Sequence, residues 1–210
     1  MAYILEPKTI NKTKDLKSRL HLGCGSIILP NHVNVDHVAL PGVDVVHDLT
    51  EFPWPFVDQQ FDDVILVDIL EHLPSVVKTL EEVYRITKPD GRVLIRVPYY
   101  NSTDASGDPT HIHFFNECTL DFFDPGREMG QSRAYYSSAK FHIRVVGYRV
   151  YFLRRVFLIC NGDEAKNTLM PEPYKVKLMA NAFLKKCLPY LAHPLGNIIR
   201  TLHFELVRLP

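Results

Sequence analysis

The segment 101–115 carries histidine and aspartate side chains of the kinds that move protons in enzymes. His111 is the first choice for a general base, because imidazole titrates near neutral pH. Asp108 stands three residues before it and could orient the ring. A plain turn, in which Asp108 caps the backbone and His111 packs on its neighbours, explains the same pattern. His72, in Leu70-Glu71-His72-Leu73, is the next catalytic candidate, or else it closes the turn that contains it.

The same segment raises the question of a metal site, because Asp108, His111 and His113 lie close together in the sequence. A His-x-His pair on an extended segment places both rings on one side, which metal ions can use. No third and fourth ligands follow at local spacing. The sequence therefore predicts no metal ion.

A second group of chemically useful residues stands where predicted strands end. Gly23-Cys24-Gly25 follows the first strand, Asp36 ends the second and Asp48 ends the third. Two glycines let a ligand lie against backbone N–H groups, and a carboxylate such as Asp36 can accept hydrogen bonds from a ribose diol. Asp48, with an adjacent amide, could contact an adenine edge. Each feature alone fits a structural turn or a solvated aspartate, but the ordered set favours a nucleoside site.

Short apolar runs rich in valine, isoleucine and leucine must position these residues, and such runs are typical of buried parallel strands. The predicted strands are Arg19–Leu22, His32–Val35, Val43–Val46, Asp63–Val67 and Arg92–Val97. The clearest helix is predicted over 75–87, with Ser75 as its N-cap and the turn Lys88-Pro89-Asp90-Gly91 after it.

The second half of the chain begins with a long loop over 101–130 that holds one short helix near Glu117–Phe123. A strand over 142–153, an amphipathic helix over Lys175–Leu191 and a strand over 201–208 follow. The pattern predicts an open α/β sheet, mostly parallel, with an antiparallel addition near one edge. Ligands bind such sheets beyond the carboxyl ends of the strands.

Composition bounds the partners of the chain. Its 210 residues carry 24 basic and 24 acidic side chains, so no net charge attracts nucleic acid, and none is expected to bind. The four cysteines are far apart, which suits a reducing compartment and excludes a zinc ribbon. Residues 1–17 look like a polar leader without a signal peptide, and no apolar run could span a membrane. A cytoplasmic protein with one domain over 18–210 is expected.

Several segments together resemble the class I S-adenosylmethionine-dependent methyltransferases, over about residues 18–125. The segments that carry the resemblance are Leu20-His21-Leu22-Gly23-Cys24-Gly25, Asn34-Val35-Asp36, His47-Asp48-Leu49, Phe61-Asp62-Asp63-Val64, Leu70-Glu71-His72-Leu73 and Leu94-Ile95-Arg96-Val97-Pro98. The resemblance implies a Rossmann-like doubly wound sheet of about seven strands, with S-adenosylmethionine as the cofactor. Residues 18–100 would form the cofactor-binding half and 101–210 the acceptor side.

The resemblance also assigns residues to parts of the cofactor. Gly23, Cys24 and Gly25 would approach its methionine part, and Asp36 would bind the ribose hydroxyls. The other implied contacts are Asp48 and Leu49 at the adenine, and Val67 and Asp68 beside the amino group or the acceptor.

The chain departs from the family pattern in its glycine loop. His21 replaces an acidic residue, Ile27 replaces a third glycine, and only ten residues separate Gly25 from Asp36. So short a connection leaves little room for a helix. These departures keep open a catalytically impaired S-adenosylmethionine-binding module. A nicotinamide-dependent oxidoreductase needs a dinucleotide loop that is missing here.

The expected acceptor is a hydroxyl or amine of a small molecule or saccharide. The stretch Asp108–Phe115 resembles a subgroup associated with modification of surface polysaccharides or small molecules. The aromatic residues around this loop could form the floor of an acceptor pocket or anchor the loop to the sheet. The basic face of Lys175–Leu191 could rest on an anionic membrane, or the helix could simply pack on the core. The oligomeric state stays open.

Overall fold

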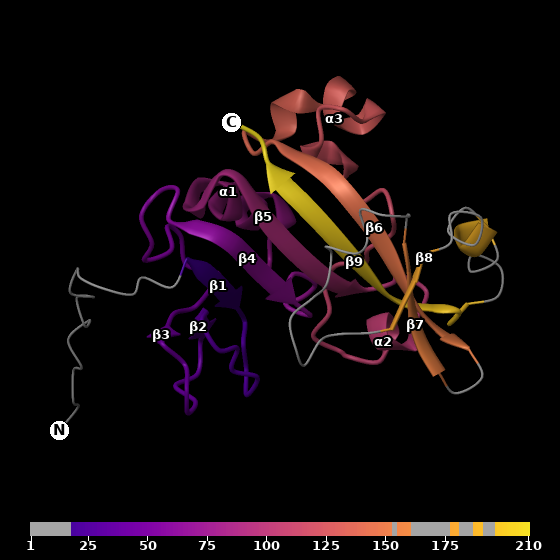
Figure 1. The fold of residues 1–210 in the computed structure, drawn as a ribbon, viewed down its shortest axis with the longest axis horizontal. Coiled ribbons are helices and arrows are strands. Elements are labelled where there is room, and N and C mark those ends of the chain that lie inside the picture. Colours follow the sequence, from indigo (N-terminus) through magenta and orange to yellow (C-terminus); the bar gives the residue numbers. More distant parts are fainter. Residues whose placement is uncertain (1–17, 153–154, 161–176, 181–186, 191–195) are drawn as a thin grey trace.

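The computed structural model describes residues 18–152, 155–160, 177–180, 187–190 and 196–210. These residues form one nine-stranded sheet in the order β3-β2-β1-β4-β5-β9-β6-β7-β8 (Figure 1). The strands are β1 (Arg19–Leu22), β2 (Val33–Asp36), β3 (Val45–Val46), β4 (Phe61–Val67), β5 (Thr87–Pro98), β6 (Phe141–Phe152), β7 (Arg155–Cys160), β8 (Lys177–Ala180) and β9 (Ile199–Arg208). The helices are α1 (Val76–Ile86), α2 (Thr103–Ser106) and α3 (Glu128–Ser132), with 3-10 turns η1 (Asp121–Phe123) and η2 (Ala134–Tyr136).

The sheet has the predicted mixed topology. Strands β1 to β5 pair in parallel, and β9 lies antiparallel between β5 and β6. The first seven strands in this order, β3-β2-β1-β4-β5-β9-β6, therefore form the predicted seven-stranded sheet. Strands β7 and β8 extend it at one edge. Because β1 to β5 run in the same direction, their carboxyl ends share one edge of the sheet.

Alternation along β4 shows why the central strands are apolar on both faces. Val64 and Leu66 belong to the main core, which also contains Leu80 and Val83 of α1. Ile65 and Val67 point to the other face, where they pack with Leu29 and Leu94. Burial on both faces is what a continuous apolar run predicts.

Helix α1 confirms the predicted helix within one residue at each end. The Ser75 hydroxyl accepts a hydrogen bond from the Lys78 backbone N–H at 3.2 Å and caps the first turn. The predicted turn 88–91 does not separate helix from strand as expected. Instead, Thr87 pairs with Phe61 and Arg92 with Asp63, so the intervening residues bulge from β5 at the start of the sheet.

The connections between the first strands are loops rather than helices. No helix occurs in 23–32 between β1 and β2, or in 37–44 between β2 and β3. Of the described helices only α1 is longer than five residues. The fold class is confirmed. The doubly wound pattern lacks helices between β1 and β2 and between β2 and β3, because a short loop is enough to span each of these two connections.

The prediction of one helix over Lys175–Leu191 is wrong for part of its length. Lys177–Ala180 form β8, which pairs in parallel with Phe157–Cys160 of β7. Residues 187–190 are helical, and 175–176, 181–186 and 191 lie outside the described residues. A neighbouring strand edge overrides a local helical pattern, because it offers partners to four backbone groups in a row. None of the described helices is long and apolar enough to cross a membrane.

Candidate functional site

The turn after β1 depends on its two glycines. Gly23 and Gly25 have φ angles of 63° and 52°, in the left-handed region that glycine adopts without strain. A Cβ atom on Gly23 would lie 2.6 Å from Cγ1 of Ile69, which belongs to the loop after β4. The backbone N–H of Cys24 donates to the Val35 carbonyl at 2.9 Å and ties the turn to β2. The ends of β1, β2 and β4 are thus held closely together.

Asp36 lies beside this turn, as the sequence predicts. Its Oδ2 accepts the Gly25 N–H at 2.8 Å, and its Oδ1 accepts the Val38 N–H at 3.1 Å. The residue is 7% exposed, so these bonds are shielded from bulk water. A carboxylate offers about four acceptor positions, so lone pairs remain for a ligand.

A cavity of about 280 Å³ opens beside the turn, and we call it the glycine-turn cavity. Four predicted cofactor residues line it: Gly23, Asp36, Asp48 and Leu49. Hydrogen bonds from Thr50 lower the pKa of the Asp48 carboxyl and keep it ionised. The walls of the glycine-turn cavity combine carboxylates with the apolar side chains of Leu49, Ile69 and Leu73. This combination suits a nucleoside with a polar ribose and an apolar base.

The remaining predicted cofactor residues lie elsewhere. Cys24 is 3% exposed, burial raises the pKa of its thiol to about 11, and it does not line the cavity. The Gly25 N–H is already donated to Asp36. Val67 packs in the smaller core cluster, because strand alternation turns it away from the site. Asp68 pairs with Arg96 and lines the neighbouring cavity instead.

Sequence reasoning missed two histidines of the glycine-turn cavity. His37 and His47 line it, and each stands directly beside a strand-end aspartate that the sequence did single out. The His37 ring lies 3.2 Å from Asp36. The position of each histidine next to the end of a predicted strand was therefore the signal that could have identified it. His21, in contrast, is completely buried beside Asn34, and burial lowers the pKa of its imidazole to about 4.

A second cavity of about 520 Å³ adjoins the first, and we call it the loop cavity. His72 lines both cavities. The loop cavity is also lined by Asp68, Glu71, Asp104, Asp108, His111 and Arg149. It lies at the ends of β4 and β5 beneath the segment 101–115, where the sequence places the chemistry.

Glu71 docks the loop on the end of β4. Its carbonyl oxygen accepts hydrogen bonds from Ile112 N–H at 3.0 Å and His113 N–H at 3.2 Å. Its side chain is 1% exposed, and neither carboxyl oxygen has a hydrogen-bond partner among the described residues. Burial raises the pKa of the Glu71 carboxyl to about 8. A buried acid without a partner is unusual, and the sequence did not single it out.

His111 is oriented by a backbone carbonyl rather than by Asp108. Its Nδ1 donates to the Ala105 carbonyl at 2.9 Å, which leaves Nε2 of the neutral ring with a free lone pair. Nε2 lies 3.9 Å from Glu71 Oε1 and 3.9 Å from Asp108 Oδ2, too far for a hydrogen bond. Asp108 instead accepts the Thr110 N–H at 2.8 Å and hydroxyl at 2.6 Å. Its expected role in orienting the ring is therefore not seen.

The two rings of the His-x-His pair do not share one site. His111 faces the loop cavity, whereas His113 lines an apolar cavity of about 350 Å³ together with Phe114 and Phe122. Phe115 and Phe123 are buried in the main core, as the interpretation of loop anchors predicts. His111 instead meets His72, whose ring contacts it edge-on with centroids 4.6 Å apart.

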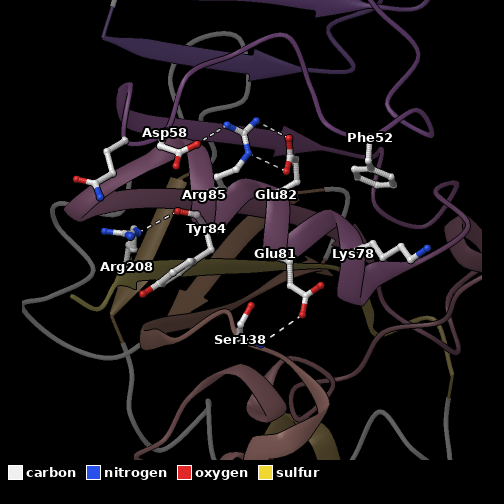
Figure 2. Close-up of a pocket in the computed structure, with 10 residues that line it drawn as sticks. Phe52, Asp58, Lys78, Glu81, Glu82, Tyr84, Arg85, Ser138 and Arg208 are labelled. Atoms are coloured by element: carbon white, nitrogen blue, oxygen red, sulfur yellow. Dashed lines mark hydrogen bonds and ion pairs between the residues drawn. The ribbon is translucent and has the colours of Figure 1, made fainter.

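Another cavity, of about 570 Å³, lies away from this edge of the sheet (Figure 2). Figure 2 shows Arg85 between Glu82 and Asp58, with which it forms ion pairs. The guanidinium carbon of Arg208 lies 4.2 Å from the centroid of the Tyr84 ring. Since α1 runs back from the carboxyl edge, these residues sit near the amino ends of β4 and β5. Their mutual pairing indicates a structural network.

The strand order and the glycine turn with its strand-end carboxylates define a Rossmann-like fold, in which ligands bind at the carboxyl ends of the strands. A family model described as a methyltransferase domain matches residues 28–95. No curated protein matches the chain significantly.

Several solved structures share the fold. A SAM-dependent methyltransferase from Archaeoglobus fulgidus is 15% identical, with a TM-score of 0.54, over 90% of this chain and 85% of that one. A possible histamine N-methyltransferase from Thermotoga maritima is 13% identical, with a TM-score of 0.52, over 90% and 81%. The Haemonchus contortus phosphoethanolamine N-methyltransferase 2, in complex with S-adenosylhomocysteine, is 14% identical, with a TM-score of 0.51, over 91% and 49%.

The methyltransferase-domain model covers about a third of the chain, and the solved structures, at 13–15% identity, show that the chain shares the fold of methyltransferases that use S-adenosylmethionine. The residues that line the glycine-turn cavity fit this cofactor, because carboxylates that can accept hydrogen bonds from ribose hydroxyls lie beside apolar side chains that can contact the base. The oxidoreductase alternative is not supported, since residues 26–32 after the glycine turn form a loop and not the helix that a dinucleotide needs.

Proposed function

We propose that the chain transfers a methyl group to a hydroxyl or amine of a polar small molecule or saccharide held in the loop cavity. The observation that carries this proposal is that the two cavities share His72 as a common wall. A methyl donor in one and an acceptor in the other would meet at that wall. Such alignment of two reactants supplies much of the catalysis in a displacement reaction.

The cofactor contacts follow from the lining of the glycine-turn cavity. Asp36 would accept the ribose hydroxyls on the lone pairs that the Gly25 and Val38 amides leave free. Asp48 and Leu49 would contact the adenine. Gly23, which has no side chain, would let the methionine part of the cofactor lie close to the protein backbone. Bound S-adenosylmethionine supplies an electrophilic methyl group on a sulfonium sulfur.

The lining of the loop cavity favours a neutral or cationic acceptor that is rich in hydrogen-bond donors. Four acidic side chains face it, against the single arginine Arg149. Asp68 and Asp104 are paired with Arg96 and Arg200, whereas Asp108 is bound only by neutral Thr110 donors and lies 3.9 Å from the His111 ring. Sugar hydroxyls and amines donate readily to carboxylates. An acceptor with several phosphates would find one arginine, Arg149, among these carboxyl groups in the lining.

His111 is the proposed proton acceptor. Its Nδ1–H is engaged by the Ala105 carbonyl, so Nε2 can take the proton of an acceptor hydroxyl as the oxygen attacks the methyl carbon. The carbon–sulfur bond breaks and its electron pair stays on sulfur. Asp108, with its Oδ2 3.9 Å from Nε2, stands where its carboxylate would stabilise the imidazolium that forms.

Calorimetric titration of the full chain with S-adenosylmethionine, S-adenosylhomocysteine and NAD tests the first step. Micromolar binding of the first two supports the proposal, and binding of NAD alone contradicts it. A screen with labelled methyl donor against nucleotide sugars, lipid-linked glycans and small phenols then identifies the acceptor class. Cofactor binding without transfer to any of them would favour the impaired binding module.

The catalytic role of His111 is tested by His111→Asn, with His113→Asn as the matched control from the same loop. We expect turnover to fall by about 10²–10⁴-fold in His111→Asn, the usual contribution of a general base. Affinity for S-adenosylhomocysteine should stay within about threefold, because His111 does not line the glycine-turn cavity. Full activity of His111→Asn would remove this residue from the mechanism.

A further inference from the structure

We infer that Glu71, His72 and His111 bind a divalent transition-metal ion in the wall between the two cavities. Each residue offers one potential ligand atom, and these atoms all lie within 4.8 Å of one another. Local sequence spacing did not reveal this group, because 39 positions separate His72 from His111. The loop 101–115 brings them together through the hydrogen bonds that Ile112 and His113 donate to the Glu71 carbonyl.

Both imidazole rings are oriented as metal ligands require. The His111 Nδ1–H donates to the Ala105 carbonyl, which leaves the Nε2 lone pair directed towards Glu71. His72 Nδ1 lies 3.0 Å from the Thr110 hydroxyl oxygen, and that hydroxyl gives its own hydrogen to Asp108 at 2.6 Å. His72 Nδ1 must then be the donor, so its lone pair is also on Nε2. Metal-bound histidines show this arrangement, with the second nitrogen held by a carbonyl or a carboxylate network.

Glu71 supplies an independent indication that this place binds a ligand. Its side chain is 1% exposed, and no described residue donates a hydrogen bond to either carboxyl oxygen. A carboxylate withdrawn from water without a partner is strongly disfavoured. A bound cation removes that penalty by pairing with the charge. The two imidazoles beside it complete a set of ligand atoms that a metal ion can bind.

The spacing of the group is slightly wider than that of a closed site. Ligand atoms in a tetrahedral site lie about 3.3 Å apart, since bonds to zinc measure about 2.0–2.1 Å. Glu71 Oε1 and His111 Nε2 are 3.9 Å apart, so small side-chain rotations suffice to close the group. Two imidazoles and one carboxylate suit Zn²⁺, Co²⁺ or Fe²⁺ better than Mg²⁺ or Ca²⁺, which prefer oxygen ligands. Three protein ligands leave a coordination position open towards the cavities.

Binding of the ion can be measured without cofactor or acceptor, but its consequence for turnover rests on the proposed function. The ion would occupy the Nε2 lone pair on which the proposed general base depends. Metal-loaded and metal-free protein should therefore differ in turnover with the same acceptor. Metal binding and cofactor binding remain separate measurements.

The test uses the full chain after treatment with a chelator. We expect calorimetry to show one tightly bound equivalent of Zn²⁺ or Co²⁺ and far weaker binding of Mg²⁺. Glu71→Gln, His72→Asn and His111→Asn should each weaken Zn²⁺ binding by more than about tenfold. His113→Asn is the matched control, because its ring faces the aromatic cavity, and its affinity should match that of the unchanged chain. Thermal unfolding of each metal-free variant establishes that it is folded.

Three results would overturn the inference. The unchanged chain could fail to bind either ion, or the folded Glu71→Gln and His111→Asn variants could bind as tightly as it does. A thiolate charge-transfer band in the Co²⁺ spectrum would place the ion on cysteines instead. Titration of metal-free Glu71→Gln with S-adenosylhomocysteine separates the two proposals, since retained binding shows that the cofactor site does not depend on the metal site.

Discussion

Replacing Asp36 by Asn should reduce both cofactor affinity and stability, for two separable reasons. The Asp36 oxygens each accept one backbone amide, from Gly25 at 2.8 Å and Val38 at 3.1 Å. The amide side chain keeps one acceptor oxygen and turns an NH₂ group towards the other N–H. Hydrogen bonds to charged groups contribute roughly 1.5–3 kcal/mol, and at 7% exposure little is screened. We expect the free energy of unfolding to fall by about that amount.

The loss of cofactor affinity has the same origin on the ligand side. Removing one charged acceptor for a ribose hydroxyl should raise the dissociation constant of S-adenosylhomocysteine about 10- to 100-fold, since each 1.4 kcal/mol is tenfold. Calorimetric titration measures it, and urea denaturation measures the stability.

Asp44→Asn is the matched control for Asp36→Asn. Its carboxylate also binds a backbone amide, that of Asn34 at 2.8 Å, but it does not line the glycine-turn cavity. This variant should lose stability while keeping its affinity within about threefold. If folded Asp36→Asn binds S-adenosylhomocysteine as tightly as the unchanged chain, the ribose lies elsewhere and the assignment of the cavity is wrong.

Three further predictions concern the glycine turn and its surroundings. Gly23→Ala should destabilise by roughly 2–5 kcal/mol in urea denaturation, from backbone strain plus overlap with Ile69, whereas Gly25→Ala, with open space around its Cβ, should lose only about 1–2 kcal/mol. The His21 pKa of about 4 lies below its unfolded value near 6.5, so the unfolded chain binds the proton first as the pH falls. The free energy of unfolding should therefore fall by about 3 kcal/mol from pH 6.5 to pH 4, and His21→Gln should reduce this fall. Cys24 should resist alkylation of the native protein, monitored by mass spectrometry, while exposed Cys118 reacts; equal rates would contradict the buried placement.

The central sheet could be predicted from the sequence because its signals are local. Strand β4 is apolar at consecutive positions, and both of its faces are indeed covered. Ser75 caps α1 as its residue type suggests. The glycine turn and Asp36 come together because parallel strands end at one edge, so that strand-end position alone predicts proximity.

The residues that the sequence misplaced depend on contacts between distant segments. Nothing local shows that the Glu71 carbonyl receives the loop at Ile112 and His113, and that docking decides which way His111 faces. Val67 belongs to β4, and the alternation of side chains along this strand directs it into the smaller core cluster. Lys177–Ala180 form a strand only because β7 offers them an edge. In each case a tertiary partner determines the outcome, and a window of neighbouring residues does not contain it.

Glu71 connects stability with function in this fold. A buried carboxyl group without a hydrogen-bond partner among the described residues opposes folding, and burial is the main cause that raises its pKa to about 8. Leucine or methionine would fill a similar space without burying a polar group, so packing does not explain the acid. Its backbone carbonyl holds the loop in place, but any residue supplies a carbonyl. What only an acid supplies is a carboxyl group that can bind a cation as its carboxylate, beside two oriented imidazoles at the wall between the cavities, and local rules tend to be broken where a site requires it.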